Sequence, residues 1–566
     1  MLLFLTACGG ASAFTLAAPD NDPAALARAL AAERRPAPPA HPSAYMVTAD
    51  GKLVGWDLAA GRQKFAVAAP ISSRVVAGAG QVVGREGAAL VARGADDGRV
   101  LWSHPLATGA FLGVAGDGDR AYYVVKQAQY HLVAVRGGKE IWRSSADGSL
   151  GVPAARGGLV FVPYFNQWLT ILDGATGATL ARIRLTDETL SFVRADDAAV
   201  TYGSRGAFVL DARSAAGSRA ASTYLAPALP AFARPMLHFD AYGAAQTSYG
   251  ALDRNRLLWR VADGAFVGGV VTWLHYRYLF AFDAAAGTLR WAYAEAGGDV
   301  AAGEDTGAAI LLATQNGDIV ALDRATGAVL ARMATGARVA GATFDAGGFR
   351  PAGPNTPTGA APAQVLTAII SDRDARFPAV KQLAVETLGR LTGPEVTAAL
   401  IRVLRDETSP ADIRERAADV LVKRRDETGL PAILDALAIH TDFVTSTYPR
   451  GVDVLARAVA SLGLPEAAPA LVAHLNDPAT PPTTLGEIVR ALVAIGARDA
   501  FAELRSYLLL YRCDPTFEND PQILGDVIDA VLALGGGAGR EAVAWVADEP
   551  RTVKAVAAYA RRAIGE

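Results

Sequence analysis

Residues 279–291 read LFAFDAAAGTLRW, and this stretch carries the pattern that decides the fold of the first part of the chain. An apolar run leads to Asp283, Gly287 follows four residues later, and Trp291 stands four residues after the glycine. Short apolar runs bounded by turn residues are typical of β-strands. An aspartate can hydrogen-bond the backbone of a turn, and a glycine can take a positive φ where the chain reverses. The stretch therefore predicts a β-hairpin.

The hairpin pattern returns along the chain with a nearly constant period. Clean copies contain the pairs Asp57 and Gly61, Asp173 and Gly177, Asp283 and Gly287, and Asp323 and Gly327. Weaker copies place turns at Gly98, Gly138, Gly217 and Asn255, and the eight anchors are spaced by 37, 40, 39, 40, 38, 32 and 40 residues. About 39 residues hold four strands of about five residues with short turns, which is one propeller blade. Eight anchors predict eight blades, and the short interval with the irregular stretch 218–251 leaves seven blades open.

A large ring follows four positions after five of these anchors. The rings are Phe65, Trp102, Trp142, Trp259 and Trp291. We expect them to pack between neighbouring blades. In stretches such as 97–102 and 286–291 the repeat resembles the tryptophan-docking blade of pyrroloquinoline-quinone-type propellers, over about residues 43 to 350. That family includes the quinoprotein dehydrogenases and the outer-membrane assembly lipoproteins of the BamB type.

These relatives differ in chemistry, so the choice between them separates an enzyme from a scaffold. The resemblance to the dehydrogenases would imply a quinone and a calcium or lanthanide ion at the propeller centre, with adjacent cysteines in many members. The propeller segment contains no cysteine, and no cluster of carboxylates and amides suited to calcium stands out. Asp117-Gly118-Asp119 is the best local candidate, but it is explained more simply as a turn between strands. The BamB type is the better match and implies no catalytic residue, no cofactor and no metal.

The last two hundred residues change to a helical period after a Pro- and Gly-rich linker at 347–362. Apolar residues at 3.6 spacing predict helices over 377–391, 396–404, 413–422, 430–439, 452–462, 467–475, 485–495, 501–510, 523–534 and 553–564. Turn signals recur at intervals of 36, 34, 33 and 41 residues. The pattern resembles a HEAT-like α-solenoid over residues 363–566, with tetratricopeptide or other helical pairs left open. The predicted fold class is thus multidomain, with an all-β propeller followed by all-α repeats.

The first residues resemble the lipobox of bacterial lipoprotein signal peptides. Leu5-Thr6-Ala7-Cys8 matches in order, although no Lys or Arg precedes the short apolar run. The resemblance implies that Cys8 is lipidated, and Gly9 rather than aspartate after it resembles an outer-membrane address. The alternative is an ordinary apolar N-terminus with a chance cysteine. We expect residues 1–8 to be a signal remnant, residues 9–43 an Ala/Pro-rich tether and residues 44–346 the propeller.

Composition and the remaining motifs exclude several function classes. The chain has 566 residues and a formal net charge of −3, so no global basic field favours nucleic acid as a partner. No segment holds the 18 or more continuous apolar residues of a membrane span. The seven histidines show no short metal-binding spacing, and Gly535 to Arg540 lacks the Lys-Ser/Thr of a phosphate-binding loop. Cys513 is left as an unpaired thiol.

Propellers and solenoids are both shapes that bind other molecules. The first hypothesis is a non-catalytic scaffold, lipid-anchored in the bacterial outer membrane and facing the periplasm. Its expected partners are other envelope proteins, with the barrel-assembly machinery implied by the BamB resemblance. The alternatives are a periplasmic quinoprotein-like oxidoreductase and a surface-exposed binding or adhesion scaffold.

Overall fold

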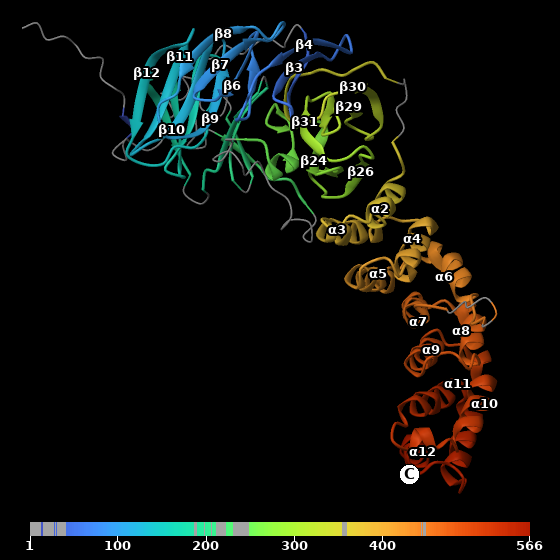
Figure 1. Ribbon diagram of the computed structural model, residues 1–566. Helices are drawn as coiled ribbons and strands as arrows, with labels where there is room; N and C mark the ends of the chain where they lie inside the picture. Colours follow the sequence, from blue (N-terminus) through green and yellow to red (C-terminus); the bar gives the residue numbers. More distant parts are fainter. Residues whose placement is uncertain are drawn as a thin grey trace, which may run out of the picture. The chain divides into compact units, whose positions relative to one another are not determined.

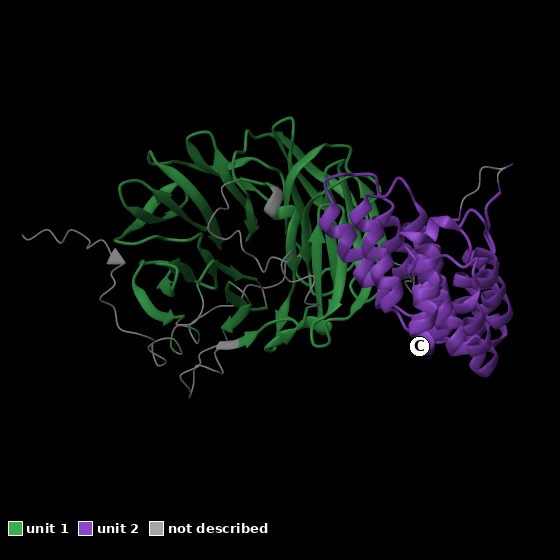
Figure 2. Ribbon diagram, turned by 90° about the horizontal axis from the view of Figure 1, so that it is seen from below, with its two compact units in different colours: residues 1–361 green, residues 362–566 purple. Residues whose placement is uncertain are grey.

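The computed structural model describes residues 13–14, 28, 30, 41–185, 189–196, 198–204, 206–210, 222–229, 248–353, 359–442, 444 and 449–565. The chain divides into two compact units, residues 1–361 and residues 362–566 (Figure 2).

The described strands of the first unit form seven antiparallel four-stranded blades (Figure 1). The second blade contains β5 (Val76–Gly78), β6 (Gln81–Glu86), β7 (Ala89–Gly94) and β8 (Val100–Pro105). The third contains β9 (Ala110–Asp117), β10 (Arg120–Lys126), β11 (Tyr130–Arg136) and β12 (Lys139–Ala146). The short strand β1 (Ala13–Phe14) adds to the edge of β12 in parallel.

The remaining blades follow in chain order. The fourth contains β13 (Ala154–Arg156), β14 (Leu159–Tyr164), β15 (Trp168–Asp173) and β16 (Thr179–Arg184). The fifth contains β17 (Phe192–Ala195), β18 (Val200–Gly203), β19 (Ala207–Leu210) and β20 (Ser222–Leu225). The sixth contains β21 (Asn255–Leu258), β24 (Val270–His275), β25 (Tyr278–Asp283) and β26 (Leu289–Ala294). The seventh contains β27 (Val300–Asp305), β28 (Ala309–Thr314), β29 (Asp318–Asp323) and β30 (Val329–Ala334).

The first blade is built from both ends of the propeller segment. Three of its strands are the first of the ring, β2 (Ser43–Thr48), β3 (Lys52–Asp57) and β4 (Arg62–Ala68), and the fourth is β31 (Val339–Asp345). β31 pairs antiparallel with β2, in a register that sets Ser43 opposite Asp345 and Tyr45 opposite Thr343. This pairing closes the ring.

Seven blades is the open alternative of the sequence prediction, and the structure confirms it over eight. The sixth anchor along the chain, Asn255, marks no turn, because it is the first residue of β21 and pairs with His275 of β24. A small hairpin, β22 (Val261–Ala262) with β23 (Ala265–Phe266), is inserted between β21 and β24. With this insertion the sixth blade runs from Asn255 to Ala294, so the anchors Asn255 and Gly287 fall within one blade. Gly217 lies outside the described residues.

Each clean copy of the motif forms the expected turn between the third and fourth strands of a blade. In the sixth blade, Asp283 Oδ1 accepts hydrogen bonds from the backbone N–H groups of Ala285 (2.9 Å) and Ala286 (2.8 Å). Those donors, together with Arg290, lower the pKa of Asp283 to about 2. Asp57, Asp173 and Asp323 accept from their own turns in the same way.

The rings after these turns lie against the turn glycine of the following blade. A Cβ on Gly327 would stand 2.5 Å from the ring of Trp291, and a Cβ on Gly177 would stand 2.7 Å from that of Trp142. Trp291 also donates its indole N–H to the carbonyl of Arg324 (3.0 Å), and Trp142 donates to the carbonyl of Gly174 (3.1 Å). Each tryptophan ring therefore packs so close to the backbone of the turn that only glycine, which has no Cβ, fits there.

The other rings follow this arrangement in part. A Cβ on Gly98 would stand 2.6 Å from the ring of Phe65. A Cβ on Gly138 would stand 3.3 Å from the Cβ of Trp102. Trp259 does not follow it, because it succeeds the innermost strand β21 rather than an outer turn. Trp259 is 1% exposed, and its ring packs edge-on against Phe192 of the fifth blade and Phe266 of the sixth, so it lies between neighbouring blades by a different contact.

The second unit is a series of helices in two rows (Figure 1). One row contains α3 (Pro378–Gly389), α5 (Ala411–Lys423), α7 (Val452–Leu462), α9 (Pro482–Ala494) and α11 (Gln522–Asp548), each contacting the next. The other contains α2 (Pro362–Ile370), α4 (Pro394–Arg405), α6 (Leu430–Leu437), α8 (Ala468–Leu475) and α10 (Phe501–Tyr511), and α12 (Lys554–Ile564) packs on α11. Short 3₁₀ turns precede three helices of the second row, η6 (Glu427–Gly429), η7 (Pro465–Ala467) and η8 (Arg498–Ala500). Helix α2 was missing from the predicted helical runs.

Among the described helices, α11 alone is long and apolar enough to cross a membrane by length and composition. It is interrupted at Gly536, where φ is 54° and ψ is −126°. Val527, Ile528 and Val531 on it are 0% exposed, and it packs against α9, α10 and α12. These contacts are those of a core helix.

Two glycines allow the contact between Trp291 and the next blade to be tested by mutation. Gly327 and Gly336 both have a φ of 70°, but nothing lies within 4 Å of a Cβ on Gly336. Gly336→Ala should cost only the strain of the left-handed conformation, about 1–2 kcal/mol. Gly327→Ala should cost about 1–3 kcal/mol more, because the new methyl group displaces Trp291. Chemical denaturation of both variants measures the difference, and equal losses would mean that the contact contributes nothing.

Candidate functional site

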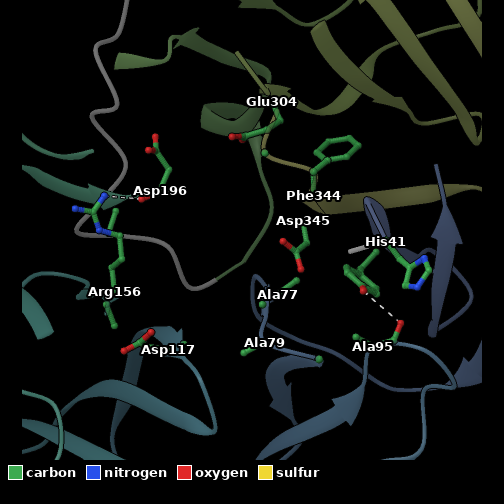
Figure 3. A pocket seen from close by; sticks show the side chains of 18 of the residues that line it. His41, Ala77, Ala79, Ala95, Asp117, Arg156, Asp196, Glu304, Phe344 and Asp345 are labelled. Atoms are coloured by element: carbon green, nitrogen blue, oxygen red, sulfur yellow. Dashed lines mark hydrogen bonds between the residues drawn. The ribbon is translucent and has the colours of Figure 1, made fainter. Parts of the chain in front are cut away.

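The innermost strands of the seven blades surround a central channel with a cavity at one end. The cavity has a volume of about 540 Å³ and receives residues from all seven blades. Figure 3 shows Asp117, Arg156, Asp196, Glu304 and Asp345 around it. Most of the lining residues stand at or just beyond the ends of the innermost strands, and Lys64 of β4 and Asp96 after β7 join them from farther out in their blades. The cavity is therefore lined by a few residues from each of many separate segments of the chain.

Most charged groups of the cavity are engaged by the protein itself. Arg194 on β17 pairs with Glu304 on β27 at 2.6 Å, and its Nε lies 3.9 Å from Asp196. Asp196 Oδ1 also accepts from the backbone N–H groups of Ala198 and Ala199, both at 2.9 Å. Arg156 donates to the backbone carbonyl of Asp196 at 2.7 Å. Arg156 thus links the fourth blade to the fifth, and Arg194 links the fifth to the seventh by a charge-assisted contact.

Asp117 has a structural partner of its own. Its carboxylate accepts from the backbone N–H groups of Gly157 (3.1 Å) and Gly158 (2.6 Å) of the next blade. The sequence Asp117-Gly118-Asp119 lies where β9 ends and β10 begins, so it is the turn that the simpler interpretation expected. Asp119 pairs with Arg136 at 2.6 Å on the surface.

A second group of polar residues lies where the ring closes. Lys64 pairs with Asp96 at 2.6 Å, and the hydroxyl of Tyr45 donates to the carbonyl of Ala95 at 3.3 Å. Burial raises the pKa of Tyr45 to about 12, although a hydrogen bond with the Ser43 side chain acts to lower that pKa. Burial also raises the pKa of Asp345 above its usual range, and the charge of Lys64 offsets this only in part.

The channel continues to a middle cavity of about 300 Å³ and a cavity of about 480 Å³ at its opposite end. Tyr249 lines both of them. Its hydroxyl accepts from the backbone N–H of Val75 at 3.2 Å, and its ring covers Gly341 of β31, where a Cβ would overlap it. Beside it, Arg74 pairs with Asp253 at 2.5 Å. Tyr249 thus stands between the two cavities.

The arrangement suits recognition by polar contacts more than covalent chemistry. Cysteine is absent from the residues that line the 540 Å³ cavity, and His41 is their sole histidine. The carboxylates Asp117, Asp196 and Glu304 are already bonded to N–H groups or arginine. A calcium ion requires six to eight oxygen ligands, so these residues do not fit a calcium-quinone centre.

The residues singled out from the sequence lie elsewhere in the fold. The turn residues Asp57, Gly61, Asp173, Gly177, Asp283, Gly287, Asp323 and Gly327 and the rings Trp102, Trp142 and Trp291 belong to the third and fourth strands of their blades, away from the channel axis. Cys8 lies outside the described residues. Cys513 is exposed and forms no disulfide. Of the residues that line the 540 Å³ cavity, Asp117 and Gly118 belong to a stretch that the sequence singled out, and the others were not predicted because they stand in no recognisable local motif.

Comparisons with known proteins agree with both halves of the sequence interpretation. A family model described as outer membrane protein assembly factor BamB matches residues 86–222, and a model described as HEAT repeats matches residues 363–447. The chain joins a BamB-type propeller to HEAT-like repeats. The first match runs from β6 in the second blade to the start of β20 in the fifth. A BamB-type propeller suggests a scaffold that binds proteins.

Two solved structures are similar over about half of the chain. BamB from Moraxella catarrhalis is 15% identical over 53% of this chain and 84% of its own, with a TM-score of 0.32. The computationally designed Ika8 protein is 12% identical over 55% of this chain and 93% of its own, with a TM-score of 0.33. No curated protein matches the chain.

The raised pKa of Asp345 predicts a defined pH dependence. A carboxyl whose pKa is higher folded than unfolded opposes folding once the pH exceeds its unfolded value of about 3.9, and this penalty grows until the pH passes the folded pKa. Asp345→Asn should therefore raise Tm at pH 7 and have little effect below about pH 4. Thermal unfolding between pH 3.5 and 8 measures the change.

Asp96→Asn is the matched control, because it removes a carboxylate of the same cavity whose side chain is 81% exposed. Breaking such a surface pair typically changes stability by about 0–1 kcal/mol. A uniform loss of stability in Asp345→Asn at every pH would contradict the prediction.

Proposed function

We propose that this protein is a non-catalytic scaffold of the bacterial cell envelope, anchored in the outer membrane through lipidated Cys8 and facing the periplasm. It binds other envelope proteins, and we propose the barrel-assembly machinery as its partner. The observation that carries the proposal is the match of residues 86–222 to the BamB model. Residues 363–566, with HEAT-like repeats, add a second binding surface that the BamB match does not include.

The channel supports a binding role over the oxidoreductase alternative. Glu304, Asp196 and Asp117 are bonded to partners within the protein, so these three carboxylates are not free to bind a calcium ion. Paired groups of this kind hold adjacent blades in fixed positions and leave the loops around the channel to recognise a partner.

The lipid anchor is tested by comparing the two cysteines of the chain. Cys8→Ala should abolish incorporation of labelled palmitate and move the full-length protein from the membrane to the soluble fraction, because two or three acyl chains provide the anchoring free energy. Cys513→Ala is the matched control and should retain both label and membrane association. Label that persists in Cys8→Ala would refute the anchor.

The partner is tested by affinity purification from detergent-solubilised envelopes after cross-linking in intact cells. We expect barrel-assembly components to be recovered with the full-length chain in stoichiometric amounts. Failure to recover any of them would reject this partner. Quinone-dependent dye reduction after incubation of the purified protein with pyrroloquinoline quinone and calcium would support the enzyme alternative, and protease cleavage on intact cells would support the surface-exposed one.

A further inference from the structure

His440, His474 and Asp477 meet between two consecutive helical repeats. His474 lies in the last turn of α8, Asp477 follows that helix, and His440 stands three residues after the end of α6. Helices α6 and α8 lie side by side in the same row (Figure 1). One nitrogen or oxygen atom from each of the three side chains lies within 4.8 Å of the others. The centroids of the two imidazole rings are 4.5 Å apart.

The imidazole of His474 presents a buried lone pair that no protein group uses. Its Nε2 lies 2.7 Å from the carbonyl oxygen of Leu437. A carbonyl only accepts, so Nε2 carries the proton and Nδ1 of the neutral ring has the free lone pair. Nδ1 has no hydrogen-bond partner, although the residue is 0% exposed. Buried polar atoms nearly always have a partner, so this atom indicates a missing ligand.

Asp477 is held in place as an ionised carboxylate. Its Oδ1 accepts from the backbone N–H of Ala479 at 2.9 Å, and its Oδ2 accepts from the backbone N–H of Thr441, next to His440, at 3.4 Å. Burial alone would raise the pKa of Asp477, but these donors and His474 outweigh it and lower the pKa. The bond to Thr441 ties the segment after α6 to the end of α8.

We propose that His440, His474 and Asp477 bind a divalent transition-metal ion, with Zn²⁺ as the probe of choice. Two imidazole nitrogens and one carboxylate form a donor set that Zn²⁺ accepts and that Mg²⁺ and Ca²⁺, which prefer oxygen ligands, do not. Three protein ligands leave a fourth position for water. The N–H of His474 bonded to the Leu437 carbonyl is the outer contact that fixes the tautomer of metal-ligating histidines.

Little movement would complete the site. Bonds of about 2.0–2.1 Å in a tetrahedral geometry separate ligand atoms by about 3.4 Å. The side chain of His440 is exposed and can rotate toward the fixed pair. The ion would then connect the ends of α6 and α8 and fix the contact between two repeats.

The experiment uses the full-length protein with Cys513→Ser, because an exposed thiol could itself bind the metal. After chelator treatment, titration calorimetry with ZnCl₂ should give one site per chain, and Co²⁺ should produce the visible absorption of a tetrahedral complex. Zn²⁺ should also raise Tm, since it binds the folded chain. His440→Ala and Asp477→Asn should each lower the affinity for Zn²⁺ more than about tenfold. Each removes a direct ligand, and the loss of a residue that only hydrogen-bonds a ligand already costs about that much.

His41→Ala is the control, because it removes an exposed histidine of the other unit. Both site variants should fold, since His440 is exposed and an asparagine amide oxygen can still accept from Ala479 and Thr441; circular dichroism checks this. Binding that is absent in the parent chain, or unchanged in both site variants, would overturn the proposal. The first result would leave the ordinary explanation, a hydrogen bond from a reoriented His440 to Nδ1 of His474.

Discussion

The pairing of β31 with β2 is the interaction on which the propeller depends. It joins residues about 300 positions apart into one blade and leaves no open end in the ring of sheets. In the first, second, third and sixth blades an outer aromatic residue lies against the turn glycine of the next blade, so these contacts require the blades to keep their places in the ring. Closure also brings Lys64 of β4 and Asp345 of β31 to the same end of the channel.

The local part of this architecture could be predicted from the sequence because its chemistry is local. Asp283 and Gly287 lie in one turn, and their hydrogen bond and positive φ need no distant residue. The blade number was harder to predict, because it depends on which strand pairs with which. Asn255 shares the spacing of a turn residue, but its pairing with His275 across the inserted hairpin makes it part of an innermost strand.

The channel could not be predicted because its side chains come from distant parts of the sequence. Arg194 and Glu304 are 110 residues apart and meet because the fifth and seventh blades both reach the axis. Neither residue belongs to a motif, and the charged side chains of the cavity come from blades that are far apart in the sequence. The cluster of His440, His474 and Asp477 has no short metal-binding spacing in the sequence for the same reason. Its two histidines come from neighbouring repeats and approach each other only when α6 packs on α8.

The two units differ in how they limit local opening. In a closed ring each blade has two neighbours, so a blade cannot separate without breaking two interfaces. In a solenoid each repeat contacts only its neighbours, so one interface can open without the rest. A link between adjacent repeats therefore has most effect at its own interface. The hydrogen bonds from His474 to Leu437 and from Thr441 to Asp477 already connect α8 to the end of α6. A metal ion bound there would strengthen the same interface without changing the fold of either repeat.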